Sequence, residues 1–160
     1  MRRAFGKTIV KLRAKDPNII LMSGDVEQEM DEFKKLYPES YYNMGLCEQS
    51  WVTMAAAMAL EGLRPVLYTI TPFLIERAFE QIKLDIDDQK LPVMLIGNSD
   101  YPTHGTSHQC LNAKGLVSLF KNVVGFFPHN QLETEKAMID CYLMKTPGII
   151  SLMREGLPFF

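Results

Sequence analysis

An uninterrupted apolar run, LPVMLIGN at residues 91–98, is the feature that most restricts how this chain can fold. A strand with one face in water alternates apolar and polar side chains, whereas a strand covered on both faces is apolar throughout. The run therefore predicts a strand in a sheet that has helices on both of its faces.

Helical and short apolar segments alternate along the rest of the chain. Further strands are expected at IILMSGD, SYYNMG, RPVLYTI, NVVGFFP and GIISLMR, with helices between them. One long amphipathic helix is expected at 71–90, with Thr71 as its N-cap and Pro72 as its first residue. This alternation predicts a doubly wound, mainly parallel sheet of five or six strands, with 1–160 forming one domain.

Composition excludes several classes of function. The chain has 47% hydrophobic and 22% charged residues, the balance of a soluble globular protein. Its 17 basic and 19 acidic residues form no basic stripe, so nucleic acid is not an expected partner. Because no apolar run approaches a membrane span, we expect a cytoplasmic protein. The three cysteines show neither disulfide nor zinc spacing, and no metal site is predicted in this chain.

Polar residues collect where the expected strands end. In an open parallel sheet, ligands bind outside the carboxyl ends of the strands. The segments at those ends are SGDVE, MGLCEQ, TITPF, NSDYPTHGTSHQ and REGLP. This edge of the sheet is therefore the expected site.

Glu48 has two interpretations. A carboxylate in the first turn of a helix is stabilised by the unpaired amides and the positive end of the helix dipole. The following helix, WVTMAAAMAL, is however unusually apolar. A carboxyl group shielded from water there can exchange a proton near neutrality or hydrogen-bond to a basic ring nitrogen.

His104 and His108 lie four residues apart in a loop that contains proline and glycine. This spacing suits a metal only on a helix, so proton transfer or substrate binding is the favoured role, and a solvated loop position is the alternative. The chain also lacks GxxxxGK[ST], GxGxxG and a GDG with a downstream Asn. A phosphate-binding cradle is therefore not expected in it.

The chain resembles the pyrimidine-binding domain of transketolase-like enzymes that use thiamine diphosphate. The resemblance is carried by MGLCEQSWVTMAAAMALEGLRPVLYTITPFLIERAFEQIKLDI, with support from RRAFGK, SGDV, HGTSHQ and SLMREGLP. It implies that Glu48 hydrogen-bonds N1′ of the cofactor's aminopyrimidine and so helps thiazolium C2 to lose its proton.

The resemblance also assigns roles to other residues. Phe73 would stack on the pyrimidine ring, with Leu46 and Ile70 as weaker cofactor contacts and Asp25 as support near the cofactor. His108 would contact the substrate and Arg154 would bind a substrate phosphate, with Arg77, His104 and Arg2 as further substrate-binding candidates.

Complete family members carry a diphosphate-binding domain before this one and a smaller domain after it, and neither is found in the chain. The resemblance therefore implies a separate partner subunit with GDG and the Mg²⁺ ligands, in an α2β2 assembly. Such an assembly would transfer a two-carbon ketol unit from a ketose to an aldehyde, with sugars or sugar phosphates as substrates.

Two alternatives stay open at this point. One is a subunit that resembles deoxyxylulose-phosphate synthase or decarboxylates a 2-oxo acid. The other is a non-catalytic assembly subunit with the same fold.

Overall fold

The computed structural model describes residues 1–98 and 105–153. Six strands form one sheet in the order β2-β1-β3-β4-β6-β5, and every neighbouring pair is parallel. The strands are β1 (Ile19–Ser23), β2 (Tyr41–Asn43), β3 (Arg64–Ile70), β4 (Met94–Asn98), β5 (Val124–Phe126) and β6 (Gly148–Ser151). The predicted doubly wound α/β class is confirmed.

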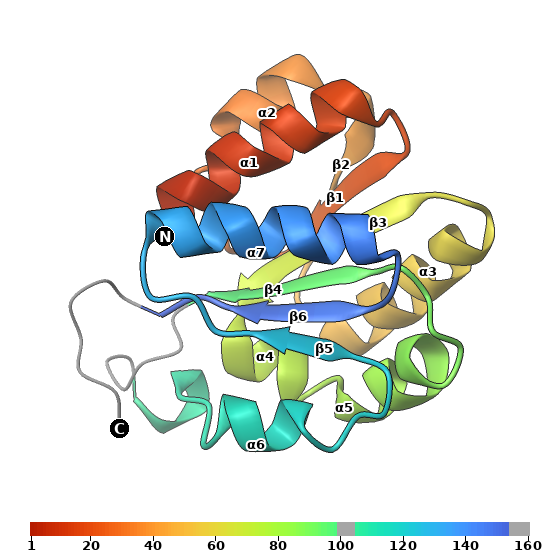
Figure 1. Ribbon diagram of the computed structural model, residues 1–160, viewed down its shortest axis with the longest axis vertical. Helices are drawn as coiled ribbons and strands as arrows, with labels where there is room; N and C mark the ends of the chain where they lie inside the picture. Colours follow the sequence, from red (N-terminus) through yellow and green to blue (C-terminus); the bar gives the residue numbers. More distant parts are fainter. Residues whose placement is uncertain (99–104, 154–160) are drawn as a thin grey trace.

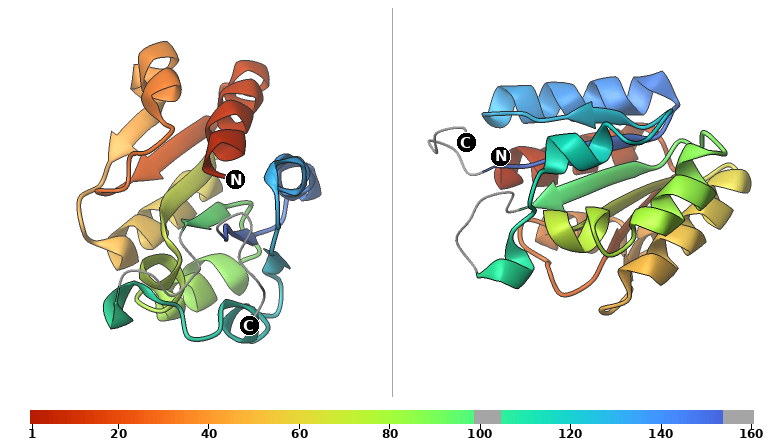
Figure 2. Two further views of the ribbon diagram at one scale, coloured as in Figure 1. Left: turned by 90° about the vertical axis from the view of Figure 1, so that its left-hand side faces the viewer. Right: turned by 90° about the horizontal axis from the view of Figure 1, so that it is seen from below.

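Helices cover both faces of this sheet (Figures 1 and 2). One face carries α1 (Arg2–Lys15), α2 (Asp31–Leu36) and α7 (Gln131–Met144). The other carries α3 (Glu48–Leu60), α4 (Thr71–Ile75), α5 (Phe79–Gln81), the π-helical segment η2 (Ile82–Asp87) and α6 (Ala113–Val117). Two 3-10 turns, η1 (Pro38–Ser40) and η3 (Thr106–His108), lie in the connections.

The side chains of each central strand pack into two hydrophobic cores, one on each face of the sheet. On β1, Ile20 and Met22 enter the core on the α3 side, while Ile19 and Leu21 enter the core on the α1 side. Successive side chains of a strand point to opposite faces, so only a run that is apolar at every position can fill both cores. This explains the apolar run that forms β4, whose five residues are all buried.

The prediction of one long helix at 71–90 is wrong. The segment is broken into α4, α5 and η2. Thr71 lies inside α4 rather than capping it, and its hydroxyl donates to the carbonyl of Asn98 at 3.2 Å. At the far end Asp87 is held by tertiary hydrogen bonds. Helical periodicity cannot detect such long-range contacts.

A helix occurs before β2 as predicted, and α2 covers only Asp31–Leu36. Glu29, two residues before it, has φ 66°, which a right-handed helix excludes. Across the described residues, no helix is long and apolar enough to cross a membrane.

Candidate functional site

The loop that leads into α3 is fixed to the end of β1. Met44 donates its backbone N–H to the carbonyl of Ser23 at 2.6 Å, and Gly45 then turns with φ 68°. A Cβ on Gly24 would lie 2.7 Å from the Gly45 carbonyl and 2.8 Å from the Trp51 ring. Glycine is therefore needed at 24 for the two loops and Trp51 to approach this closely.

Glu48 begins α3 and is almost fully buried, with 3% of its surface exposed. Its Oε2 lies 3.6 Å from Nη1 of Arg77, which is too long for a good hydrogen bond. Its Oε1 has no hydrogen-bond partner among the described residues. A buried carboxylate oxygen without a partner is rare, and it favours a ligand as the missing partner.

Phe73 on α4 contacts two other predicted residues, Arg77 and His108. The guanidinium Cζ of Arg77 lies 3.6 Å from the centre of the Phe73 ring. The His108 ring meets Phe73 edge to face, with 4.9 Å between centroids, and Ser107 Oγ lies 2.9 Å from His108 Nδ1. Glu48, Phe73, Arg77 and His108 are called the Glu48 cluster below.

The Glu48 cluster combines a shielded carboxylate, an aromatic ring and two basic side chains. Such a set can hold a flat heteroaromatic ring, because the carboxylate bonds to its edge while the phenyl ring stacks on its face. His108, beside Phe73, provides a ring nitrogen that can hydrogen-bond to a second ligand.

Of the other predicted site residues, the structure describes Leu46, Ile70, Asp25 and Arg2. Leu46, in the loop before α3, is 67% exposed. Ile70 packs into the core on the α1 side of the sheet, opposite α3. Asp25 and Arg2 are exposed, and His104 and Arg154 lie outside the described residues.

A second carboxylate near this edge was not predicted from the sequence. Glu27 accepts hydrogen bonds from Lys34, Tyr41 and Asn43. These bonds, the one from Lys34 first, lower the pKa of Glu27 from 4.5 to about 2. The three side chains that donate hydrogen bonds to Glu27 come from the chain itself rather than from a ligand, so Glu27 stabilises the β1–β2 connection. No short motif could have indicated the contact between Glu27 and Tyr41, because the two residues are 14 positions apart.

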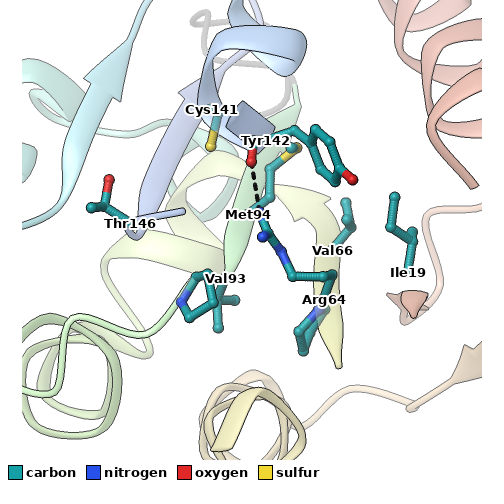
Figure 3. Close-up of a pocket in the computed structure, with 10 residues that line it drawn as sticks. Ile19, Arg64, Val66, Val93, Met94, Cys141, Tyr142 and Thr146 are labelled. Atoms are coloured by element: carbon teal, nitrogen blue, oxygen red, sulfur yellow. Dashed lines mark hydrogen bonds between the residues drawn. The ribbon is translucent and has the colours of Figure 1, made fainter. Parts of the chain in front are cut away.

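A shallow pocket lies at the opposite edge of the sheet, where the strands begin (Figure 3). Most of its lining is apolar, and Arg64 already donates to the Tyr142 carbonyl at 2.7 Å and stacks on the Tyr142 ring. Burial raises the pKa of the Cys141 thiol to about 12, so this cysteine is unreactive. The pocket is therefore a weaker candidate for a catalytic or ligand-binding site than the Glu48 cluster.

Within residues 1–98 and 105–153, no three His, Cys, Asp or Glu side chains gather as a metal site would require.

A parallel α/β sheet with a shielded carboxylate and an aromatic side chain at its carboxyl edge is the arrangement of an α/β domain that binds a ligand at that edge. The family model described as transketolase, pyrimidine binding domain, matches residues 1–158. The chain therefore belongs to the transketolase pyrimidine-binding domain family.

Relatives of known name support this membership. The chain is 31% identical over 170 residues to 1-deoxy-D-xylulose-5-phosphate synthase of Prochlorococcus marinus, covering 98% of this chain and 25% of that protein. It is 34% identical over 158 residues to the synthase of Thermosynechococcus vestitus, with 94% and 24% covered. The chain thus spans about a quarter of the length of these relatives.

Solved structures of transketolases have the same fold as this chain. A split gene transketolase, solved as an inactive beta4 tetramer, superposes with a TM-score of 0.87 at 30% identity, and 99% of this chain and 52% of that chain are covered. Transketolase from Leishmania mexicana has a TM-score of 0.85 at 19% identity over 96% of this chain and 25% of that one, a likeness of fold.

Proposed function

We propose that this chain is the pyrimidine-binding subunit of a transketolase-like enzyme that depends on thiamine diphosphate. In this role Glu48 would hold N1′ of the cofactor's aminopyrimidine ring. The enzyme would transfer a two-carbon ketol unit between a ketose and an aldehyde. When bound, thiamine diphosphate supplies the carbanion chemistry that the protein's own side chains lack.

One observation carries the proposal: Glu48 is 3% exposed, and its Oε1 has no partner among the described residues. Family membership makes an aminopyrimidine nitrogen the natural partner of this oxygen. Because the carboxyl group is shielded from water, a hydrogen bond to a ring nitrogen is strong and a proton can be shared along it.

The remaining cluster residues would orient the two reactants. Phe73 would stack on the pyrimidine, and His108, whose ring meets Phe73 edge to face, would hold or protonate a substrate oxygen. Leu46 and Ile70 keep their assignment as weaker cofactor contacts, and Asp25 keeps its assignment as support near the cofactor. In the proposed enzyme Arg154, His104, Arg77 and Arg2 would bind the sugar or sugar-phosphate substrate.

A partner subunit would complete the site. This chain has none of the sequence motifs that bind a diphosphate, so the partner would supply GDG and the Mg²⁺ ligands in an α2β2 assembly. The likeness to a split gene transketolase, solved as an inactive beta4 tetramer, supports this division of labour. We expect the chain without its partner to be inactive.

The test uses the chain assembled with that partner, thiamine diphosphate and Mg²⁺. Ketol transfer should occur in the assembly and in neither chain alone, and Glu48→Gln should nearly abolish it. Normal turnover by the Glu48→Gln assembly would refute the assignment. An assembly that forms and yet shows no cofactor-dependent heat in calorimetry would favour a non-catalytic subunit.

A second reaction is favoured by the curated relatives, which are 1-deoxy-D-xylulose-5-phosphate synthases. In that case the same site would serve the decarboxylation of a 2-oxo acid such as pyruvate. Release of carbon dioxide from pyruvate, measured beside ketol transfer from a ketose, separates the two reactions.

A further inference from the structure

Arg77 makes two contacts in the Glu48 cluster at the same time. Its guanidinium lies 3.6 Å above the Phe73 ring centre, and its Nη1 lies 3.6 Å from Oε2 of Glu48. The first distance is that of a stacked pair, and the second is that of a loose ion pair.

The two ends of this ion pair differ in their freedom to move. The Arg77 side chain is 45% exposed, whereas the Glu48 side chain is only 4% exposed. Arg77 can therefore swing into solvent at a small cost, whereas Glu48 is fixed by the packing around α3. Phe73, at 4% exposure, has its solvent side closed by the guanidinium.

A guanidinium and an aminopyrimidine ring can make the same two contacts. Both are flat, delocalised groups that stack on an aromatic face and present nitrogen atoms at their edge to a carboxylate. A single position above Phe73 and beside Glu48 cannot hold both.

Resting on the function proposed above, we infer that Arg77 occupies the aminopyrimidine position while the cofactor is absent. The ring then binds only after Arg77 has moved away. Arg77 is thus an internal competitor that closes the half-site of the isolated chain. Because a site that is open only part of the time has a lower apparent affinity, removal of Arg77 should strengthen binding of a pyrimidine.

The test measures binding rather than turnover. The full chain is titrated with 4-amino-5-hydroxymethyl-2-methylpyrimidine, the aminopyrimidine half of thiamine, and followed by NMR signals of the Phe73 and His108 rings. Arg77→Ala should bind this probe about three- to ten-fold more tightly than the wild type, the range expected for loss of one exposed ion pair and one cation–π contact. Arg77→Lys keeps the charge without the flat group, so its affinity should lie between these two.

Arg13→Ala is the matched control. Arg13 also combines a cation–π contact, 4.8 Å from the Tyr37 ring, with an ion pair, 3.0 Å from Glu39, and it lies at the opposite edge of the sheet. Its loss should leave affinity for the probe unchanged.

Glu48→Gln separates the inference from the proposed function. If Glu48→Gln weakens binding while Arg77→Ala leaves it equal or weaker, the Arg77 inference is overturned and the pyrimidine site stands. If Glu48→Gln has no effect on binding, or if no protein binds the probe, the pyrimidine site itself is overturned.

Discussion

Asp87 and Glu48 are both almost fully buried, at 1% and 3% exposure, yet their surroundings differ completely. Asp87 accepts backbone N–H bonds from Lys121, Asn122 and Val123 at 2.9, 2.6 and 2.9 Å. Glu48 has a loose ion pair at one oxygen, and its other oxygen has no hydrogen-bond partner among the described residues.

The difference separates a carboxylate that holds the fold from one that is kept for a ligand. A buried carboxylate is stabilising when its oxygens are hydrogen-bonded and destabilising when they are not. Asp87 has all its partners inside the chain, so its loss should affect folding. Within the described residues, one oxygen of Glu48 has no hydrogen-bond partner, so loss of Glu48 should affect function rather than folding. This contrast can be tested at both residues.

The largest expected effect is on turnover. In the assembly with its partner, thiamine diphosphate and Mg²⁺, Glu48→Ala should lower kcat by about 10²- to 10⁴-fold, the usual contribution of a well-placed acid–base group. Steady-state kinetics measures this, with Asp85→Asn as a control on the same face. A decrease in kcat of less than about three-fold would mean that Glu48, like Asp87, has a structural role.

Asp87 should show the opposite behaviour. Asp87→Asn leaves at least one of the three backbone N–H groups without an acceptor, so the free energy of unfolding should fall by about 2–4 kcal/mol. Denaturant unfolding of the full chain measures this. An unfolding free energy within about 0.5 kcal/mol of the wild type would show that these bonds are not what anchors η2.

Gly24 tests whether the position of Glu48 depends on the packed loop. A Cβ at this position meets the Gly45 carbonyl and the Trp51 ring at less than 3 Å. Gly24→Ala should therefore destabilise the fold by about 1–3 kcal/mol and shift the fluorescence of Trp51, the single tryptophan. Gly105→Ala, where a Cβ meets nothing within 4 Å, gives the comparison, although its φ of 80° adds some strain. Unchanged Trp51 emission in Gly24→Ala would contradict the close approach.

Glu27 offers a smaller effect that depends on pH. Its pKa is lowered from 4.5 to about 2 in the folded chain, so its contribution to stability is complete above pH 4.5 and is lost as the pH falls toward 2. The effect is modest because the Glu27 side chain is 40% exposed. Glu27→Gln should be less stable than the wild type at pH 7, and this difference should shrink by pH 3. A difference that stays constant over this range would contradict the linkage.

The sequence predicted the sheet better than it predicted the connections. The runs that became β3 and β4 are apolar because two cores need them, and this requirement is local to each strand. The end of η2 is fixed instead by Asp87, whose partners lie 34 to 36 residues further along the chain. No periodic pattern contains that information.

For the site, the motifs predicted which residues matter and gave no geometry. Glu48, Phe73 and His108 were singled out from the sequence and do lie together. The stacking of Arg77 on Phe73 and the missing partner of Glu48 Oε1 depend on side-chain positions that spacing alone does not encode. Glu27 was missed because its three partners lie in two other elements, α2 and β2, and are 7 to 16 residues away along the chain.

The most direct test of the contrast is the free energy of unfolding of Glu48→Gln, measured beside Asp87→Asn in the full chain. Because Glu48 Oε1 has no hydrogen-bond partner in the part of the chain that the structure describes, neutralising the carboxylate should leave stability unchanged or raise it by up to about 1 kcal/mol, even though turnover in the assembly is lost. A destabilisation as large as that of Asp87→Asn would mean that Glu48 holds the fold, and it would contradict the account.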